Sequence, residues 1–391
     1  MSRKLAAALA LLIAVALLPI PTLANPITML DFTAMESVDN TDTDHWKWNK
    51  DSQTLTLNGA TLAVPLRLPP DAKIVVNGTN SISVSHQNDQ SQSSNHFVVG
   101  NDGIVTITGT GTLNITYGTE QDLNVDNGPI KDLWEGNLVL GMKGQRGPTV
   151  NLTQNMFNSA AITGDVYVHS GTLNIKALSR AGIGIDGDVI VTGGSLDIEA
   201  MNGGIVGSLD ISGGSVRAMA KNDATSGVEG EYAGIAFGGI LKVKGGVVWL
   251  TSHTPGGTKA DRFAPAILLE KLREEGLTIK GSTTYADPNP TQTVTWQPYG
   301  TPTAPPTDLN PGGPEQPYLY PFIGDTLAKT VRISAGDDSG SQSGIIIYVP
   351  TDGTPNTTTS NPTTGANDFV GIAAAAAVVA LLGSAVILRK K

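Results

Sequence analysis

Cysteine is absent from this 391-residue chain, and aromatic and charged side chains are scarce, at 5% and 15% of residues. Without cysteine the fold contains neither a disulfide bond nor a thiolate metal site, so backbone pairing and an apolar core must stabilise it. The sequence has no phosphate-binding loop, no dinucleotide-binding fingerprint and no nucleophile elbow. The histidines are scattered without the spacing of a metal site. These absences argue against several large classes of enzyme.

The formal net charge is −10. A surface of this sign repels nucleic acid and anionic membranes, so we expect no nucleic-acid partner. Neutral glycans, cations and basic surfaces remain compatible with it. An acidic polysaccharide would need bridging cations or local basic sites.

The N-terminus has the features of an export signal. Arg3 and Lys4 precede an apolar stretch from Leu5 to Leu18, and Thr22-Leu23-Ala24 offers small residues for cleavage. This order predicts a signal peptide over residues 1–24, because the apolar stretch is too short to span a membrane.

The C-terminus has the features of a membrane anchor. Residues 369–388 carry no charge, and Arg389, Lys390 and Lys391 follow them. A helix needs roughly 20 apolar residues to cross a bilayer, and a basic tail is typical of the cytoplasmic side. We therefore predict a transmembrane helix over residues 369–388.

A pentapeptide, NPTTG, precedes this span; its residues are Asn361, Pro362, Thr363, Thr364 and Gly365. The arrangement resembles the sortase substrates, whose usual pentapeptide is LPXTG, with Asn361 in place of leucine. The resemblance implies cleavage between Thr364 and Gly365 and attachment of Thr364 to peptidoglycan. Sortase and peptidoglycan are then partners, the membrane holds the chain before sorting, and the location is the cell surface of a Gram-positive bacterium. An ordinary C-terminal anchor is the alternative.

A repeat runs through the middle of the chain: a short alternating strand, a glycine step, then a second alternating strand. The aligned glycines are Gly111, Gly171, Gly194, Gly214 and Gly246. We interpret the step of 60 residues as three coils of about twenty, and the step of 32 as one coil with an insertion at residues 221–231. Strands this short are stable only when stacked, so the repeat predicts a coiled stack of strands.

The predicted fold is therefore all-β, a parallel β-helix (solenoid) over residues 25–335. In this reading Val105, Ile107, Leu113 and Ile115 face inward. A β-sandwich with hairpins at its Asn-Gly pairs is the alternative.

Three segments, SRAGIGIDGDVIVTGGSLDIEA, NGGIVGSLDISGGSVRA and HWKWNKDSQTLTLNGATL, carry a family resemblance. They resemble the right-handed parallel β-helix proteins of Firmicute surfaces, many of which are described as carbohydrate-binding-domain proteins. The resemblance covers residues 46–333. It implies a right-handed, pectate-lyase-like solenoid that has no required lyase activity.

The ends of such a stack need covers. We expect residues 31–51 to form an N-terminal cap in which Trp46 and Trp48 pack on the first coil. Residues 265–275 predict one short capping helix, because proline stands in its first turn and Gly276 follows it. Residues 336–360 are rich in Gly, Ser, Thr, Asn and Pro and predict a disordered wall-spanning stalk before the sorting signal of residues 361–391.

The best carboxylate cluster predicted from the sequence is Asp186, Asp188 and Asp210, which stacked coils could bring to one edge. Oxygen ligands of this kind suit calcium, the one possible cofactor. Aspartate beside glycine is also an ordinary turn residue.

Candidate sugar-binding residues are the aromatic side chains Trp134, Tyr232 and Trp249, with core packing as the alternative for each. The motifs expected of a polygalacturonase are missing. We therefore expect a non-catalytic protein that binds a polysaccharide or a host or environmental glycan. The alternatives are an extracellular polysaccharide lyase or hydrolase and a structural or protein-binding adhesin.

Overall fold

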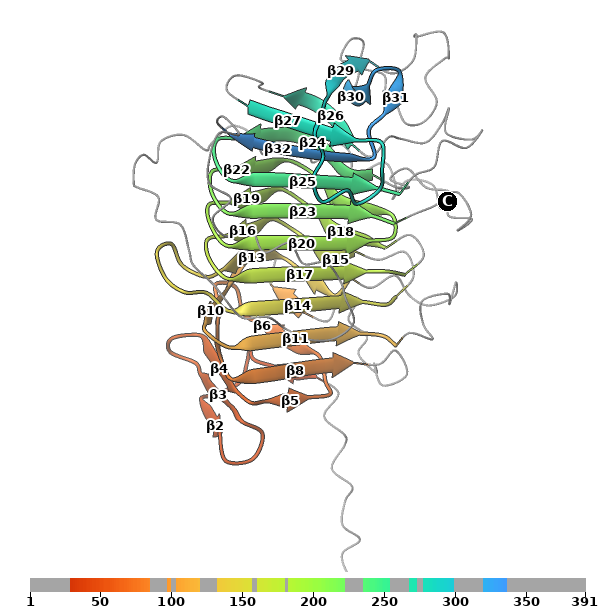
Figure 1. Cartoon of the computed structure of the whole chain (residues 1–391). Helices are drawn as coiled ribbons and strands as arrows, with labels where there is room; N and C mark the ends of the chain where they lie inside the picture. The colour runs from red at the N-terminus through yellow and green to blue at the C-terminus, as the bar shows by residue number, and fades with distance from the viewer. Residues whose placement is uncertain are drawn as a thin grey trace, which may run out of the picture. The chain divides into compact units, whose positions relative to one another are not determined.

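Short strands stacked in register make up the structure, a computed structural model (Figure 1). It describes residues 29–84, 97–99, 103–119, 132–156, 160–179, 182–221, 235–253, 267–272, 277–298 and 319–335. The predicted signal peptide, stalk, sorting motif and transmembrane segment lie outside these residues, as does Tyr232. Within the described ranges all regular structure is β, and no helix there is long and apolar enough to cross a membrane.

Most strands fall into three parallel columns, and one pass of the chain through the columns is called a rung. The first column contains β1 (Leu30–Asp31), β6 (Leu66–Leu68), β9 (Phe97–Val99), β12 (Trp134–Glu135), β15 (Ala160–Thr163), β18 (Ile183–Asp186), β21 (Gly203–Val206), the start of β24 (Ile235–Val243) and β26 (Ile267–Leu272). The second contains β4 (Thr54–Asn58), β7 (Lys73–Asn77), β10 (Ile104–Gly109), β13 (Asn137–Leu140), β16 (Val166–Val168), β19 (Val189–Val191), β22 (Leu209–Ile211) and the end of β24.

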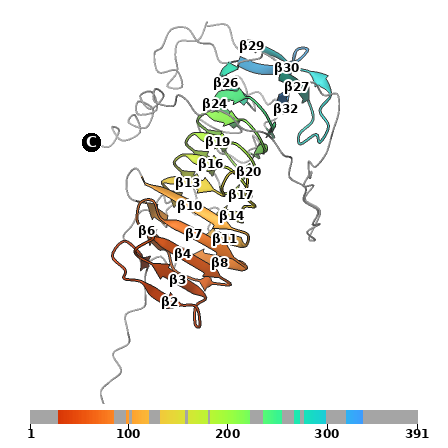
Figure 2. The same cartoon turned by 90° about the vertical axis from the view of Figure 1, so that its left-hand side faces the viewer.

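The third column contains the longer strands and is called the front sheet, because it faces the viewer in Figure 1. Its members are β5 (Thr61–Leu62), β8 (Thr79–Val84), β11 (Thr112–Tyr117), β14 (Thr149–Gln154), β17 (Thr172–Ala177), β20 (Ser195–Ala200), β23 (Ser215–Ala220) and β25 (Val247–Ser252). Figure 2 shows the rungs from the side, one above the other.

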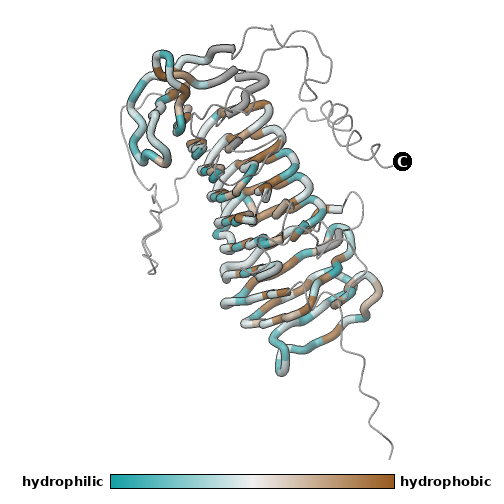
Figure 3. The backbone as a smooth tube through the Cα atoms, turned by 90° about the vertical axis from the view of Figure 1, so that its right-hand side faces the viewer, coloured by the Kyte–Doolittle hydropathy of each residue, from teal (hydrophilic) through white to brown (hydrophobic). Residues whose placement is uncertain are grey.

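Alternation of apolar and polar residues places the core between the columns, as the predicted inward residues show. Val105, Ile107, Leu113 and Ile115 are all buried. In the front sheet the register continues the Leu113 position upward through apolar side chains: Val150, Leu173, Leu196, Val216 and Val248. Figure 3 shows apolar and polar residues alternating along the coils. Each rung thus extends one continuous apolar column.

Glycine marks the corners because each rung passes very close to the one below. A Cβ on Gly214, where φ is +79°, would lie 2.4 Å from the carbonyl oxygen of Gly194. Two Asn-Gly pairs, Asn58-Gly59 and Asn77-Gly78, form further corners inside rungs, without such a close approach. Asn58 and Asn77 pair in parallel register there, so neither pair forms the hairpin turn of the sandwich alternative.

The register corrects the predicted coil count between Gly111 and Gly171. Thr112 pairs with Thr149, and Thr149 pairs with Thr172, so these 60 residues make two rungs and not three. The segments GNLVLGMKG and PTVNLTQ supply β13 and β14 of a single rung. The predicted count assumes a rung of about twenty residues, whereas this rung takes 37 residues, from Thr112 to Thr149.

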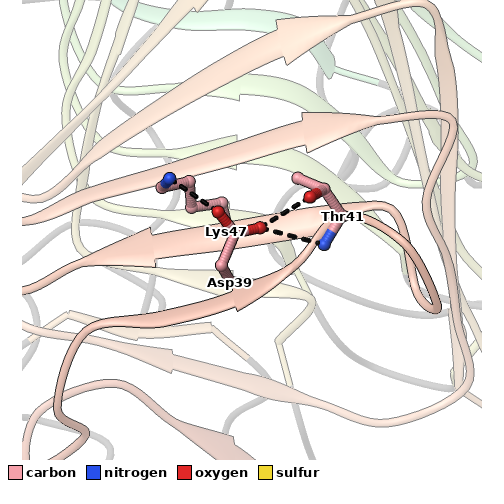
Figure 4. Close-up of polar contacts among 3 residues, drawn as sticks. All are labelled: Asp39, Thr41 and Lys47. Carbon is pink, nitrogen blue, oxygen red and sulfur yellow. Dashed lines mark hydrogen bonds and ion pairs between the residues drawn. The ribbon is translucent and has the colours of Figure 1, made fainter.

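At the N-terminal end, β2 (Val38–Asn40) and β3 (Trp46–Asn49) form an antiparallel hairpin beside β4. Trp46 and Trp48 are buried, and the ring centroid of Phe32 lies 5.7 Å and 4.9 Å from theirs. The core packing expected of both tryptophans is therefore observed. On the hairpin surface Asp39 accepts hydrogen bonds from Lys47 and Thr41 (Figure 4).

At the other end the pairing becomes antiparallel. The strands there are β27 (Leu277–Ser282), β28 (Gln292–Thr293), β29 (Thr295–Pro298), β30 (Leu319–Ile323), β31 (Thr326–Leu327) and β32 (Thr330–Ala335). In the front sheet β32 lies between β25 and β27 and pairs antiparallel with both. The last described strand thus lies inside the front sheet, with β27 and β28 beyond it.

The predicted capping helix at residues 265–275 is wrong, because residues 267–272 form strand β26. One edge of β26 continues the parallel column above β24, and Leu269 pairs with Leu319 of β30 on the other. Proline and glycine gave a valid local helix signal. The same backbone instead forms hydrogen bonds with the edge strand β24 and with β30. This tertiary pairing overrides the local helix propensity. The all-β, largely parallel architecture is otherwise as expected and is compatible with a parallel β-helix.

Candidate functional site

The outward face of the front sheet, called the front face, presents polar side chains in straight columns. Each strand alternates, so residues that pair in register lie one above another on the same face. The central column begins at Asn114 and passes through Asn151, Asn174, Asp197 and Arg217. Above these it continues through Trp249, Arg332 and Lys280.

Amide side chains link the lower part of this column. Asn151 Nδ2 donates a hydrogen bond to Asn114 Oδ1 at 2.7 Å, and Asn174 Nδ2 donates to Asn151 Oδ1 at the same distance. Each asparagine is half-buried and flanked by inward apolar residues. The ladder fixes the orientation of the amides and leaves their outer edges toward solvent.

Charged and aromatic groups form the upper part. Arg217 Nη1 lies 3.5 Å from Asp197 Oδ2, and Arg332 lies over the Trp249 ring with its guanidinium carbon 5.4 Å from the centroid. Burial raises the pKa of Asp197 above its usual 3.8, although Arg217 and Lys176 act in the opposite direction. This part therefore combines an aromatic ring with fixed hydrogen-bonding groups.

Two further columns flank the central one. On one side hydroxyls repeat at Thr112, Thr149, Thr172, Ser195 and Ser215, with Ser195 Oγ donating to Thr172 Oγ1 at 3.2 Å. On the other side Lys176, Glu199 and Met219 stack, and Lys221 forms an ion pair with Glu199. The front face is thus a flat, regularly spaced array of hydroxyl, amide and charged groups.

The loop after β27 lies against one end of this face. Thr330 Oγ1 donates to the carbonyl oxygen of Thr284 at 2.9 Å, and the Tyr285 and His253 rings meet edge to face at 4.5 Å. Burial raises the pKa of Tyr285 to about 12, with Arg217 acting in the opposite direction. Met219 is only 8% exposed despite its outward position. The loop therefore covers the face beside Met219, and the open part of the face lies away from it.

The three predicted sugar-binding aromatics fall in different places. Trp249 projects from the front face and is half-buried, with the Arg332 guanidinium over one face of its ring. Trp134 is completely buried, because β12 pairs between β9 and β15 and its ring faces the core; it presents no face to a sugar in this structure. Tyr232 lies outside the described residues. A sugar contact by Trp249 stays a prediction.

The structure does not bring the predicted metal ligands Asp186, Asp188 and Asp210 together. Asp210 pairs in register with Ile190, so it stacks on neither of the other two. Its carboxylate forms an ion pair with Lys244 at 3.0 Å. Within the residues that the structure describes, no three His, Asp or Glu side chains are grouped to hold a metal ion.

Asp188 instead belongs to a ladder at a rung corner. In this ladder a side-chain oxygen accepts a hydrogen bond from a backbone N–H one rung above, at 2.8–3.0 Å. Asn137 Oδ1 accepts from the Asp165 N–H, and Asp165 Oδ1 accepts from the Asp188 N–H. Asp188 Oδ1 accepts from the Ser208 N–H. Each side chain therefore satisfies the backbone of the next rung, which differs from the local hydrogen bond of an ordinary turn aspartate. Asp186 lies at the end of β18, where desolvation of its carboxyl and the nearby Asp132 raise its pKa.

Sequence reasoning missed Asp197, Glu199 and Arg217 as front-face residues. Their alternation in SLDIEA and SVRAMA showed that they point outward. The alignment of Asp197 and Arg217 with Trp249 depends on the register between rungs across the insertion at residues 221–231, which local pattern does not fix.

A family model described as "Carbohydrate-binding domain-containing protein" matches residues 151–286. The matched segment begins in β14 and ends beyond β27, so it includes Asp197, Arg217 and Trp249. No curated protein and no solved structure matches the chain.

Proposed function

We propose that this protein is a non-catalytic, cell-wall-anchored carbohydrate-binding protein built as a right-handed parallel β-helix. The observation that carries the proposal is the front face, where half-buried Trp249 lies in the same column as the ordered amides of Asn151 and Asn174, all within the segment matched by the carbohydrate-binding family model.

The spacing of the front face suits an extended polysaccharide. Neighbouring strands lie about 4.8 Å apart, close to the length of one pyranose unit in an extended chain. Hydroxyl and amide groups repeated at this interval meet sugar hydroxyls at regular positions. An aromatic ring such as Trp249 supports the apolar face of a pyranose and orients it.

Surface display rests on the ends of the sequence. The signal over residues 1–24, the NPTTG motif and the apolar run with its basic tail support export and sorting. Mass spectrometry of peptidoglycan digests tests this: a peptide ending at Thr364 joined to wall fragments is expected. Recovery of the intact C-terminus in the membrane fraction only would exclude sorting.

Carbohydrate binding is tested with a glycan array probed by the purified full chain, kept in mild detergent because of its apolar C-terminal run. The array is run with calcium and again with EDTA, and bound glycans are analysed for cleavage. Selective binding without products supports the proposal. A blank array in both buffers contradicts it and favours the structural or protein-binding adhesin.

Polysaccharide hydrolysis is the second candidate, favoured by two carboxylates on one strand of the front face. Asp197 and Glu199 point outward, and residues two apart on a strand lie about 6.5–7 Å apart. Inverting glycosidases separate their carboxyl groups by about 6.5–9.5 Å. However, both carboxylates are ion-paired, with Arg217 and Lys221. Products that disappear in both Asp197→Asn and Glu199→Gln would establish hydrolysis.

A further inference from the structure

Two Asn-Gly pairs occupy the same corner of neighbouring rungs. Asn58-Gly59 joins β4 to β5, Asn77-Gly78 joins β7 to β8, and the two asparagines pair in register. Both asparagines are exposed, and φ is +85° at Gly59 and +63° at Gly78. The two pairs therefore match in sequence, position and exposure.

The pairs differ in the hydrogen bond of the glycine N–H. Asn80 Oδ1 accepts from the Gly59 N–H at 2.8 Å and from the Ala60 N–H at 2.9 Å. Asn80 itself is 1% exposed, and its Nδ2 donates to the carbonyl oxygens of Asn77 and Thr112, at 2.9 and 3.2 Å. In the described part of the chain the Gly78 N–H has no hydrogen-bond acceptor.

This difference bears on a reaction of the asparagine side chain. When the N–H of the following residue loses its proton, its nitrogen can attack the asparagine Cγ. A Gly59 N–H held by the buried Asn80 oxygen must break that bond to react, whereas the Gly78 N–H has no such bond to break. The exposed Asn77 side chain also has no hydrogen bond that would hold it away from the glycine.

We propose that Asn77 is a site of spontaneous deamidation and that Asn80 protects Asn58 from the same reaction. The Gly78 nitrogen forms a bond to Cγ of Asn77, the Cγ–Nδ2 bond breaks, and ammonia leaves with the proton that Gly78 has lost. Water then opens the resulting cyclic imide at either carbonyl and leaves aspartate or isoaspartate. Water is the only co-reactant.

The product changes the base of the stack. Aspartate adds a negative charge at the corner. Isoaspartate also lengthens the main chain by one carbon between β7 and β8, and displaces the Asn77 carbonyl that accepts from Asn80 Nδ2. The buried bonds of Asn80 depend on this corner, so modification would loosen the rung that contains β7 and β8, one rung above β4 and β5.

The test is a peptide map of the full chain during incubation at mildly alkaline pH, following the mass change that replaces an amide NH2 with OH. Asn77 should react about tenfold faster than Asn58, the effect of one hydrogen bond on a barrier. In urea the two rates should converge, since both asparagines precede glycine. Equal rates in the folded chain, or no reaction at Asn77, would overturn the proposal.

Two variants sharpen the comparison. Asn77→Gln should remove the fast reaction and leave Asn58 unchanged. In Asn80→Ala, with folding checked by its thermal melt, Asn58 should accelerate toward the rate of Asn77. An Asn58 rate that stays low in a folded Asn80→Ala protein would contradict protection by Asn80. Because both sites are read in one wild-type molecule, the main result stands even if this variant does not fold.

Discussion

The Arg332 guanidinium lies over the Trp249 ring, with 5.4 Å between its central carbon and the ring centroid. The two residues pair in register between antiparallel strands β25 and β32. A cation over an indole face at a partly exposed site contributes about 0.5–1 kcal/mol. Arg332 therefore holds the ring in one orientation on the front face.

Trp249→Ala should weaken glycan binding about tenfold, because an aromatic platform contributes roughly 1.4 kcal/mol or less beyond its buried area. The measurement is a titration against whichever glycan the array identifies. Val247→Ala, an outward change on the same strand, is the matched control and should leave the affinity unchanged. Equal affinity of wild type and Trp249→Ala would remove Trp249 from the site.

Asn151→Ala should destabilise the front sheet by about 1–3 kcal/mol, because it removes two side-chain hydrogen bonds of about 0.5–1.5 kcal/mol each. Asn151 donates one to Asn114 and accepts the other from Asn174, both at 2.7 Å. Thr153→Ala, an outward change on the same strand, is the control. A thermal melt that places both variants at the same Tm would show that the amide ladder contributes nothing.

Gly214→Ala should cost about 2–4 kcal/mol, since it combines left-handed backbone strain with a clash in a tightly packed stack. The new Cβ would lie 2.4 Å from the Gly194 oxygen. Gly144→Ala shares a positive φ, at +75°, but its Cβ would meet no atom within 4 Å. That control should cost only about 1 kcal/mol. Chemical denaturation gives the free energy of unfolding of both variants. The loss in Gly144→Ala measures backbone strain alone, and the extra loss in Gly214→Ala measures the clash with the neighbouring rung.

The Asp39 carboxyl should titrate far below an ordinary aspartate. Hydrogen bonds from Lys47 and Thr41 lower its pKa from 3.8 to about 2 (Figure 4). A lowered pKa favours folding above the ordinary value, and that contribution disappears as the pH falls toward 2. In Lys47→Gln the pKa should rise toward 3.8, as NMR of the carboxyl carbon would show. An unchanged pKa would assign the shift to Thr41 alone.

Asp165→Asn should raise the Tm at neutral pH, by about 1–3 °C. Burial raises the pKa of Asp165, and the Asp188 carboxylate acts in the same direction although the hydrogen bond from the Asp188 N–H opposes it, so the folded state binds the Asp165 proton more tightly than the unfolded state. Stability therefore falls as the pH rises from 3.8 through the raised value. Asparagine keeps the acceptor oxygen, as Asn137 does one rung below.

The pH dependence provides the control for this variant. Its advantage should shrink near pH 3.8 and below, where Asp165 of the wild type is protonated in both states. A Tm that is lower than wild type at neutral pH would show that the carboxylate charge itself holds the corner.

Much of the stack could be predicted from local pattern. The alternation of apolar and polar residues correctly predicts the inward side chains of β10 and β11. The glycine steps mark the corners, because the close approach of neighbouring rungs there leaves no room for a Cβ. Pattern failed where pairing partners decide the outcome. Residues 267–272 carry a helix signal yet form β26 on an open sheet edge.

The candidate site was predictable only in part. Trp249 could be predicted as a candidate aromatic, because it lies in an alternating strand; the sequence did not decide whether its ring faces the core or the solvent. The exposure expected of Trp134 is not observed, because burial of its ring depends on the pairing of β12 with β9 and β15, which local pattern does not fix. Asp210 was grouped with Asp186 and Asp188 on the assumption that coils align by residue count. The register shifts it onto Ile190 instead.

The insertion of β32 between β25 and β27 has a mechanical meaning. Its residues pair with five positions of β25 and six of β27, and its last residue, Ala335, is itself paired with Leu277. A pull on the C-terminal side along the strand must shear both ladders at once and cannot open them one bond at a time. A tether fixed beyond Ala335 would therefore load the molecule through a strand that is held by a ladder on each side.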